Sequence, residues 1–403
     1  MKPRRIGVFT AARSEYSLLR WIIKEIHEHK DFELLLYVSG AHFSSDKGYT
    51  VVDIIEDGIK NFIKIECMLD SKTPTGLSKT LGLGIISLSQ VFEDKKPDIM
   101  IILGDRHELL IPVSVCLMNN IPIVHIAGGE ITEGVIDELV RHATTKFSHI
   151  HLVQTEVYAE NISKMGEEDY RIAVIGAPGI ENIKRIPLMD EMEIREKIGI
   201  DVKHPTVLCT YHPTTLEMKY SVLSQIEELL QALNCYPDLQ VVFTAPGVEV
   251  GSAEIEAEIM EYIENKKNAH YFKNLGSRLY LSLMKYSLFV IGNSSSGIIE
   301  APSLGVPTVN IGDRQKGRVL AQSVINCSYY REDIVKAIHK ALSNDFQKLA
   351  KKCRNPYDPY GDGMVSRRVI KILENVEIDE NLMRKRLIFE VKKHEWNTLL
   401  KNK

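Results

Sequence analysis

The sequence predicts an α/β protein with two doubly wound domains that face each other across a cleft. Its 403 residues exceed one typical hydrophobic core and suggest two domains of roughly 150 to 200 residues each. Short apolar, β-branched runs alternate with amphipathic stretches along the chain, which is the pattern of parallel βαβ units. Ligands of such folds bind at the carboxyl ends of the strands, so functional residues should directly follow strands.

The strands are predicted from these apolar runs, with helices in the gaps between them. In the first half of the chain they are Ile6–Thr10, Glu33–Ser39, Asp98–Leu103, Ile121–Ile126 and His149–Val153. In the second half they are Thr206–Thr210, Gln240–Thr244, Ser287–Ile291 and Thr308–Ile311. The charged, proline-bearing span from Asn182 to Pro205 shows no clear strand and is the predicted connection between the domains, in which Glu191–Ile198 could form a short helix.

Composition excludes several classes of protein. Hydrophobic residues at 44% and charged residues at 26% are ordinary for a soluble protein, and a net charge of -4 gives no electrostatic reason to expect nucleic acid as a partner. No segment approaches the ~18 apolar residues of a membrane span, and the N-terminus leads into a strand and not a signal peptide. The scattered cysteines form no Cys-x-x-Cys pair and predict reduced thiols in a cytoplasmic protein without zinc; they are Cys67, Cys116, Cys209, Cys235, Cys327 and Cys353.

A stretch rich in glycine and serine, Gly292–Pro302, followed by Gly312–Arg318, is the strongest candidate for an anion site. The apolar run before it predicts a buried strand, and the small residues allow a sharp turn into a helix whose N-terminus would offer free N–H groups. The side chains that would serve a nucleotide diphosphate are serine donors, a cation and, for a ribose hydroxyl, a carboxylate; they are Ser294, Ser295, Ser296 with Gly297, Arg314 and Glu300. On the residues alone, a serine-rich turn with an ordinary helix cap explains the stretch as well.

The same residues resemble a known family. They follow the pattern GNSSSGxIExPSLxVxTxNIGDRQKGR, which is similar to the nucleotide-diphosphate loop of the UDP-N-acetylglucosamine 2-epimerase family and closest to its hydrolysing, sialic-acid-pathway branch. The resemblance extends over most of residues 4–375. It implies two Rossmann-like domains of the glycosyltransferase-B type, a UDP-sugar ligand, and a homodimer or dimer of dimers. No cofactor and no metal are expected, because arginines, a histidine and a helix dipole can stabilise the diphosphate.

The predicted connection sets the domain limits, and the resemblance adds a C-terminal helix. The N-terminal domain would cover residues 1–182 and the nucleotide-binding domain residues 190–364. A C-terminal helix would cross back to the first domain from within residues 365–403, formed by Val365–Asn375 or by Asn381–His394.

After the first strand, Thr10–Leu19 resembles the family element T-x-x-R-x-[DE]-Y-x-x-L. The resemblance implies that Arg13 and the small residue Ser17 face the nucleotide phosphates. Without it, Ser14 could cap a helix and leave Arg13 on the surface. The stretch is not a GxGxxG fingerprint, so it gives no support for NAD binding. A later loop histidine, His42, matches the element V-[ST]-G-x-H and is the weaker candidate, because loop histidines are more often structural.

Candidate catalytic carboxylates follow two further strands. In the family the aspartate of Gly-Asp-Arg is catalytic, so Asp105 is the first choice, although a helix cap is the alternative from sequence alone. Many relatives carry a catalytic glutamate where this chain has Ala127, while other members of the hydrolysing branch also lack it. The work would then fall to Asp105, Glu130 and Asp137, with Asp137 matching a family aspartate if one residue of Ile131–Gly134 is an insertion. Whether Ala127 instead changes which sugar fits stays open.

Two elements of the second domain complete the candidate site. His212, in Tyr211-His212-Pro213, matches the family's His-Pro element and would contact the phosphates or the sugar, more plausibly when protonated. The stretch Pro246–Ser252 departs from the family's N-x-D-x-G-S and retains only its Gly-Ser end, which leaves the sugar open.

The chemistry expected of such a site explains these residue types. A proton at C2 of the sugar has no neighbouring carbonyl, so loss of the diphosphate must come first and make it acidic, and two carboxylates can then handle the protons. We therefore predict a hydrolysing UDP-N-acetylglucosamine 2-epimerase that yields N-acetylmannosamine for sialic acid synthesis. The alternatives are the same reaction on UDP-N,N'-diacetylbacillosamine for legionaminic acid, a retaining UDP-sugar glycosyltransferase, and a non-catalytic nucleotide-sugar sensor.

Overall fold

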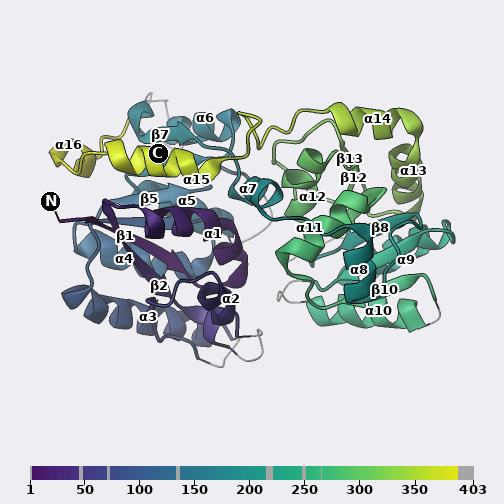
Figure 1. Cartoon of the computed structure of the whole chain (residues 1–403), viewed down its shortest axis with the longest axis horizontal. Helices are drawn as coiled ribbons and strands as arrows, with labels where there is room; N and C mark the ends of the chain where they lie inside the picture. The colour runs from purple at the N-terminus through teal and green to yellow at the C-terminus, as the bar shows by residue number, and fades with distance from the viewer. Residues whose placement is uncertain are drawn as a thin grey trace, which may run out of the picture.

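The computed structural model describes residues 2–44, 49–69, 73–132, 137–214, 221–246, 251–264 and 266–388. It contains two parallel β-sheets, each flanked by helices on both faces, arranged side by side along the long axis of the molecule (Figure 1). This confirms the predicted α/β fold with two Rossmann-like domains of the glycosyltransferase-B type.

The first sheet has the strand order β3-β2-β1-β4-β5-β6-β7, and all its pairs are parallel. Val8 pairs with Leu36 on one side and with Ile101 on the other, so the central strands are covered on both faces and read as continuous apolar runs. The strands are β1 Arg4–Thr10, β2 Phe32–Val38, β3 Ile63–Lys64, β4 Ile99–Leu103, β5 Ile123–Ile126, β6 Ile150–Val153 and β7 Ile172–Val174.

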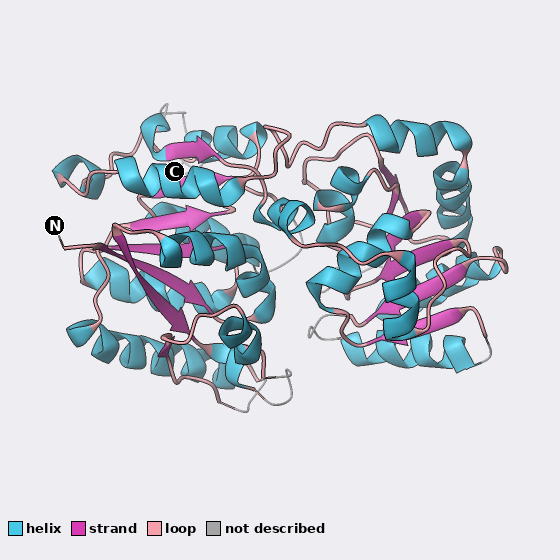
Figure 2. Ribbon diagram, in the orientation of Figure 1, coloured by secondary structure: helices cyan, strands magenta, loops and turns pink. Residues whose placement is uncertain are grey.

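Helices cover both faces of this sheet (Figure 2). Helix α1, for example, buries apolar residues spaced three and four apart, namely Leu19, Ile22, Ile23 and Ile26, against Ile6 and Val8 of the sheet. The helices are α1 Arg13–Glu28, α2 Val51–Glu56, α3 Pro74–Asp94, α4 Leu110–Met118, α5 Asp137–Phe147, α6 Glu156–Lys164 and α7 Pro178–Arg185, with short 3₁₀ turns at Gly40–Phe43, His107–Leu109 and Asp169–Arg171.

The second sheet has the order β10-β9-β8-β11-β12-β13 and is also parallel throughout. Its strands are β8 Thr206–Thr210, β9 Gln240–Thr244, β10 Ala269–Phe272, β11 Phe289–Gly292, β12 Thr308–Ile311 and β13 Val324–Cys327. Its helices are α8 Glu191–Ile198, α9 Val222–Asn234, α10 Ser252–Glu264, α11 Gly276–Tyr286, α12 Ser295–Ile299, α13 Arg331–Leu342 and α14 Asn344–Lys352, with a 3₁₀ turn at Ala301–Leu304. Helix α8 coincides with the short helix predicted in the connection.

A C-terminal helix crosses back to the first domain, as predicted. Helix α15, Val365–Asn375, follows the second domain and packs on α1 and α7 (Figure 1). Val365, Val369 and Leu373 are buried in the first domain's core. Of the other candidate, Asn381–His394, the structure describes only the part up to residue 388, where a one-turn helix α16 spans Glu380–Met383.

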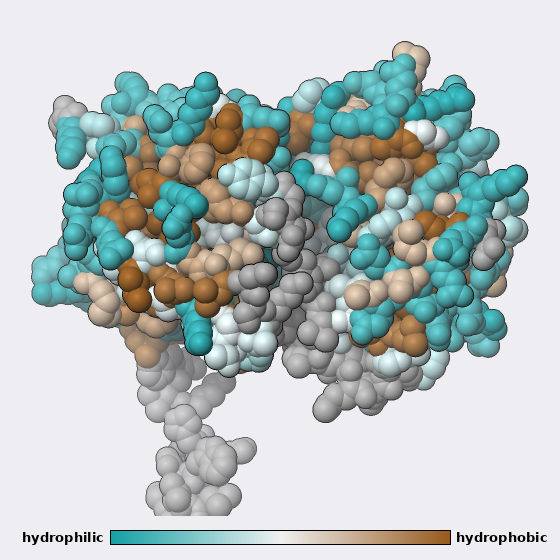
Figure 3. All heavy atoms as spheres, turned by 90° about the horizontal axis from the view of Figure 1, so that it is seen from below, coloured by the Kyte–Doolittle hydropathy of each residue, from teal (hydrophilic) through white to brown (hydrophobic). Residues whose placement is uncertain are grey.

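The domain limits expected from the sequence, 1–182 and 190–364, place each sheet within one domain, and we propose these limits with α15 added to the first. Among the described residues no helix has the length and apolar character needed to cross a membrane. Hydrophobic side chains are interspersed with hydrophilic ones on the face seen in Figure 3, and α3 exposes Leu77, Leu83 and Ile86.

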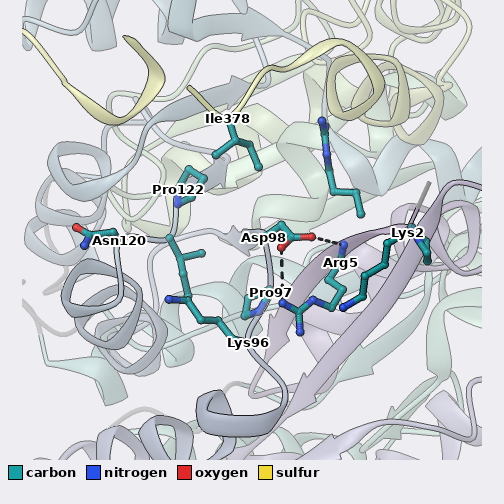
Figure 4. Close-up of a pocket in the computed structure, with 11 residues that line it drawn as sticks. Lys2, Arg5, Lys96, Pro97, Asp98, Asn120, Pro122 and Ile378 are labelled. Atoms are coloured by element: carbon teal, nitrogen blue, oxygen red, sulfur yellow. Dashed lines mark hydrogen bonds and ion pairs between the residues drawn. The ribbon is translucent and has the colours of Figure 1, made fainter. Parts of the chain in front are cut away.

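A cavity of about 490 Å³ opens at the amino ends of β1 and β4 (Figure 4). Most of the positively charged side chains that line it already have partners within the protein. Arg5 pairs with Asp98, Arg4 donates to the carbonyl of Leu373, and Lys96 donates to the carbonyl of Asn119. Because functional residues of a parallel sheet gather at the carboxyl ends of its strands, this cavity lies at the wrong edge for the predicted site.

Candidate active site

The candidate residues come from loops at the carboxyl ends of strands. Because all strands in each sheet are parallel, these loops lie along one edge of each sheet. In the first domain Arg13, Asp105 and Glu130 follow β1, β4 and β5; in the second, His212, Ser294 and Arg314 follow β8, β11 and β12. The two edges meet, since Oε2 of Glu130 lies 2.9 Å from Nη2 of Arg318.

Asn293 joins three loops of the second domain. It is fully buried, and its side chain accepts from the backbone N–H of His212 at 2.7 Å and donates to the backbone carbonyl of His212 at 2.8 Å. Its own carbonyl accepts from Arg314 Nη1 at 3.2 Å and from Gln315 Nε2 at 2.8 Å. The serine loop, the His-Pro loop and the Gly-Asp-Arg loop are thereby held together.

The serine loop turns from β11 into the five-residue helix α12 as the small residues predict. The Ser294 side chain caps the helix by accepting from the N–H of Ser296. The hydroxyl of Ser296 also bonds to that of Ser294 at 3.1 Å and to that of Tyr280 at 2.5 Å. Gly297 packs closely on β12, because a Cβ there would lie 2.8 Å from Cγ2 of Thr308. Hydroxyls therefore gather at the start of the helix, with Ser295 as its first residue.

Glu300 is held against the first domain. Its Oε1 is so close to Gly179 of α7 that a Cβ on that residue would lie 2.3 Å away. Its Oε2 is buried and has no hydrogen-bond partner. Burial raises the pKa of Glu300 to about 8. An unsatisfied buried acceptor at this position is what a ligand hydroxyl would satisfy.

Arg13 reaches toward the second domain, whereas Ser17 is used locally. Arg13 pairs with Asp53 at 2.8 Å, and its Nη2 would lie 3.5 Å from a Cβ on Gly276, the first residue of α11. The hydroxyl of Ser17 donates to the carbonyl of Ser14 at 2.9 Å. Of these two candidates, Arg13 is the better placed to meet a ligand lying between the domains.

Asp105 is held by a buried arginine. Arg141, from α5, is 1% exposed and pairs with Asp105. Its Nη1 also donates to the carbonyl of Glu130 at 3.0 Å, to Thr132 Oγ1 at 3.0 Å and to Glu138 at 2.7 Å. Arg141 therefore fixes the loops after β4 and β5 relative to each other, and it has a second carboxylate partner besides Asp105.

Among the described residues, Asp137, the first residue of α5, lacks an arginine partner such as the one that holds Asp105. In the described part of the chain its side chain makes no hydrogen bond and no ion pair. Its pKa is raised, mainly by burial and then by the negative charge of Asp105. The two carboxylates are thus electrostatically coupled. The insertion inferred from the sequence lies within Ile131–Gly134, and residues 133 and 134 of that loop fall outside the described residues, as do residues 247–250 of the divergent Pro246–Ser252 stretch.

A second arginine, Arg106, links the loops after β1 and β4. It makes a bidentate pair with Glu108 at 2.6 and 3.2 Å and lies 3.5 Å from Glu15. Glu15 also accepts from the N–H groups of Ala11 and Ala12, and its pKa is raised to about 7, chiefly by burial. Arg106, which directly follows Asp105, also acts on Asp137, because burial raises the pKa of that carboxylate and the positive charge of Arg106 lowers it.

The histidines divide into structural and candidate functional groups. His42 is fully buried between the hydroxyls of Thr10 and Thr50, each at 3.0 Å, which fits the structural role that the sequence favours. Burial and the charge of Arg314 lower the pKa of His212 to about 3. The ligand-free protein therefore holds His212 neutral, and a bound phosphate would be needed to favour the protonated form.

The loop that carries Ala127 has an unusual backbone. Ala127 is 6% exposed and has a φ of 65°, a left-handed conformation that is uncommon outside glycine. Gly129, with a φ of 76°, lies so close to α6 that a Cβ would be 2.4 Å from the carbonyl of Tyr158. Asn161 of α6 donates to the carbonyl of Gly129 at 2.8 Å. This packing sets the position of Glu130, the next residue.

Sequence reasoning did not single out several residues that organise the site, namely Asn293, Gln315, Arg141 and Arg318. Asn293, Gln315 and Arg318 lie inside the two glycine-bearing stretches Gly292–Pro302 and Gly312–Arg318, so their place in these stretches was the available signal. Within the described residues no group of three or more histidine, cysteine, aspartate or glutamate side chains could hold a metal ion.

Comparisons with known proteins agree with the geometry. A family model described as UDP-N-acetylglucosamine 2-epimerase matches residues 24–374. The chain is 38% identical over 349 residues to a Campylobacter jejuni protein named GDP/UDP-N,N'-diacetylbacillosamine 2-epimerase (hydrolyzing), covering 86% of this chain and 90% of that protein. It is 34% identical over 356 residues to a polysialic acid biosynthesis protein of Escherichia coli, covering 88% and 90%. The solved structure of UDP-GlcNAc 2-epimerase from Neisseria meningitidis, bound to UDP-GlcNAc, matches in fold with a TM-score of 0.77 at 19% identity, covering 93% of this chain and all of that one.

Proposed function

The chain belongs to the UDP-N-acetylglucosamine 2-epimerase family, and from this premise we propose that it is a hydrolysing 2-epimerase that converts a UDP-2-acetamido sugar to UDP and the free, C2-inverted sugar. One observation carries the proposal. The anion-binding loops of the second domain, held together by Asn293, meet the carboxylate-bearing loops of the first domain at the contact between Glu130 and Arg318.

In this proposal the second domain holds UDP. Hydroxyls and N–H groups at Ser294, Ser295, Ser296 and Gly297 would bind the diphosphate, with Arg314 and His212 as further donors. Arg13 would close on the same group from the first domain. The unsatisfied oxygen of Glu300 would accept from a ribose hydroxyl.

The reaction begins with the departure of UDP. The C1–O bond breaks with both electrons going to the diphosphate, and the cationic donors stabilise that charge, an effect commonly worth about 3 kcal/mol per donor. The oxocarbenium-like sugar that remains loses its C2 proton to a carboxylate and becomes a glucal. A proton then returns to C2 from the other face while water supplies the C1 hydroxyl, which gives the free manno sugar.

Asp137 and Asp105 are proposed as the two carboxylates. Asp137 is unpaired among the described residues, and its raised pKa suits a group that takes up and releases a proton. Asp105, whose negative charge acts on Asp137, is held in place by Arg141, which also pairs with Glu138 at 2.7 Å. Glu130, the third candidate from the sequence, is already bound to Arg318.

The first candidate substrate is UDP-N-acetylglucosamine, with N-acetylmannosamine as the product for sialic acid synthesis. The second is UDP-N,N'-diacetylbacillosamine, and the name of the Campylobacter jejuni relative favours it. A UDP-sugar glycosyltransferase is the alternative from another class of enzyme.

Incubation with each nucleotide sugar separates these functions. The proposal expects free UDP and free C2-inverted sugar without any acceptor, and the sugar that is turned over identifies the substrate. A GDP-linked sugar should be included, since the relative's name contains both nucleotides. Turnover that requires an acceptor would indicate a transferase, and binding without turnover a sensor. The homodimer or dimer of dimers and the cytoplasmic location stay predictions from the sequence.

A further inference from the structure

A buried contact around Glu130 and Arg318 joins the two domains, and we term it the interdomain clasp. It consists of Glu130, Ile131 and Tyr158 of the first domain and Gly317, Arg318, Val319 and Tyr357 of the second domain. The Glu130 side chain is 5% exposed and that of Arg318 is 11% exposed, and their charged groups are 2.9 Å apart. Each lies in a motif of the candidate site, one in the loop after β5 and the other in the loop that carries Arg314.

Neutral contacts surround the ion pair. Gly317 has a φ of 91°, and a Cβ there would lie 2.6 Å from Cγ2 of Ile131, so only glycine permits this approach. The N–H of Val319 donates to the hydroxyl of Tyr158 at 3.3 Å, and that hydroxyl also bonds to Tyr357 at 2.7 Å. Both tyrosines are fully buried. The loop after β12 is therefore seated on the loop after β5 by several contacts.

Burial raises the pKa of Glu130 and the charge of Arg318 lowers it, so the arginine opposes the uptake of a proton by Glu130. In the described structure Glu130 is the one anionic partner of Arg318, whose Nε and Nη1 are buried without hydrogen-bond partners. If Glu130 took up a proton, Arg318 would be left as an uncompensated buried charge, which is strongly unfavourable. Asp105 differs, since its partner Arg141 also pairs with a second carboxylate, that of Glu138, at 2.7 Å.

Resting on the proposed function, we propose that Glu130 and Arg318 are positioning residues that seat the UDP-binding loop on the carboxylate-bearing loop, and that Glu130 does not exchange protons with the sugar. The Arg318 guanidinium sets the distance between the group that binds the leaving diphosphate and the carboxylates that act on C2. Glu130 and Arg318 act together, because each holds the other's loop in place through the ion pair.

The test uses Glu130→Gln, Arg318→Lys and the double variant of the full-length protein. Positioning predicts that each single change raises KM for the UDP-sugar and weakens UDP binding by about 10-fold, while kcat falls less and the pH dependence of kcat keeps its shape. The double variant should lose no more than the worse single variant, because the two side chains form one unit. Gly317→Ala, which retains the ion-pairing groups but pushes the loop from Ile131, should give the same pattern.

Two exposed positions provide matched controls, Glu160→Gln and Arg195→Lys, which should leave binding and turnover unchanged. The proposal is overturned if Glu130→Gln binds UDP normally and loses kcat by about 100-fold or more, since that pattern belongs to a proton-transferring group. Additive losses in the double variant would also overturn it. If the wild-type protein turns over no UDP-sugar, the proposed function fails, and UDP calorimetry on the same variants still decides the role of the clasp.

Discussion

The side chain of Asn293 hydrogen-bonds both the backbone N–H and the backbone carbonyl of His212, at 2.7 and 2.8 Å. The Asn293 side chain thus joins two loops by a pair of hydrogen bonds, one accepted and one donated, as neighbouring strands of a sheet are joined. Because Asn293 also accepts from Arg314 and Gln315 through its carbonyl, it fixes the geometry of the proposed phosphate site without needing to touch the ligand.

Asn293→Ala should therefore weaken both the fold and ligand binding. It removes two hydrogen bonds to the His212 backbone, which should cost about 1 to 3 kcal/mol in the free energy of unfolding. UDP affinity should fall by at least about 10-fold, since three loops lose their common anchor. Denaturant unfolding and UDP calorimetry measure the two effects, with the exposed Asn375→Ala as the control. Normal UDP affinity in a folded Asn293→Ala protein would contradict the organising role.

Arg314→Ala and Ser295→Ala test the phosphate contacts directly. Loss of the guanidinium should cost about 1.5 to 3 kcal/mol of UDP binding energy, and loss of the hydroxyl roughly half of that. Calorimetric titration with UDP is the measurement, and uridine, which lacks phosphates, is the comparison ligand. Both variants should bind uridine as the wild-type protein does. If both also bind UDP normally, the phosphates must lie elsewhere.

Glu300 should make UDP binding depend on pH in a defined direction. Its pKa of about 8 means that the ligand-free protein holds it protonated near neutral pH. A ribose hydroxyl donates more strongly to the ionised carboxylate, so binding favours loss of this proton. The contribution of Glu300 to UDP affinity should therefore increase from about pH 6 to about pH 8 and level off above.

The Glu300→Gln variant isolates this effect, because the titration of UDP itself is the same for both proteins. The difference in affinity between wild type and variant should widen as pH rises, and 2′-deoxy and 3′-deoxy analogues of UDP should reduce it. The linked effect on stability has the opposite sign. A carboxyl group whose pKa is raised by folding contributes full stability below its unfolded value of 4.5 and loses it as pH rises through about 8. An affinity difference that is constant over this range would rule out the ribose contact through Glu300.

The sequence predicts the central strands well and misses the edges. Each predicted strand begins and ends within two residues of an observed one. The four that were missed, β3, β7, β10 and β13, are the outermost strands of the two sheets. They are two to four residues long and only partly buried, so they lack the continuous apolar run of a strand covered on both faces.

The residues of the site likewise fall into those that the sequence reveals and those that it does not. Residues that would touch a ligand, such as Arg314 and Asp137, stand in motifs that follow strands and can be found by pattern. Arg141 and Arg318 join separate loops of the site through partners far away in the sequence, Asp105 and Glu130. A single arginine in a helix or loop gives no sign of which carboxylate it will meet, because that is decided by how the helices and domains pack.

Asp137→Asn and Asp105→Asn should separate chemistry from binding. Each change preserves the size of the side chain and removes a proton acceptor, so kcat should fall by about 100-fold or more while UDP affinity stays near the wild-type value. Asp105→Asn should also lower stability, since Arg141 loses one of its two carboxylate partners. Turnover and UDP calorimetry on the same preparations give both quantities. Normal turnover by Asp137→Asn would mean that the match to the family aspartate is misplaced.

Isotopes from solvent test the order of bond breaking. In the proposed route the C2 proton leaves in the first step and another arrives in the second from the opposite face of the sugar. Reaction in deuterium oxide should therefore give a free manno sugar with deuterium at C2, and oxygen-18 water should label its C1 hydroxyl and leave UDP unlabelled. This pattern follows from cleavage of the C–O bond on the sugar side, which Arg314, His212 and the serine loop would promote by stabilising the departing UDP.

Mass spectrometry of the products distinguishes the alternatives. A simple hydrolase would give a gluco product without deuterium at C2, and a non-hydrolysing epimerase would give a C2-deuterated sugar still joined to UDP. If UDP-N-acetylglucosamine is untouched while UDP-N,N'-diacetylbacillosamine gives the same labelling, the mechanism stands with the second candidate as substrate. Oxygen-18 in UDP would place the cleavage on the phosphorus side, and an unlabelled C2 would rule out elimination, because a glucal must take its new C2 proton from a group in exchange with solvent.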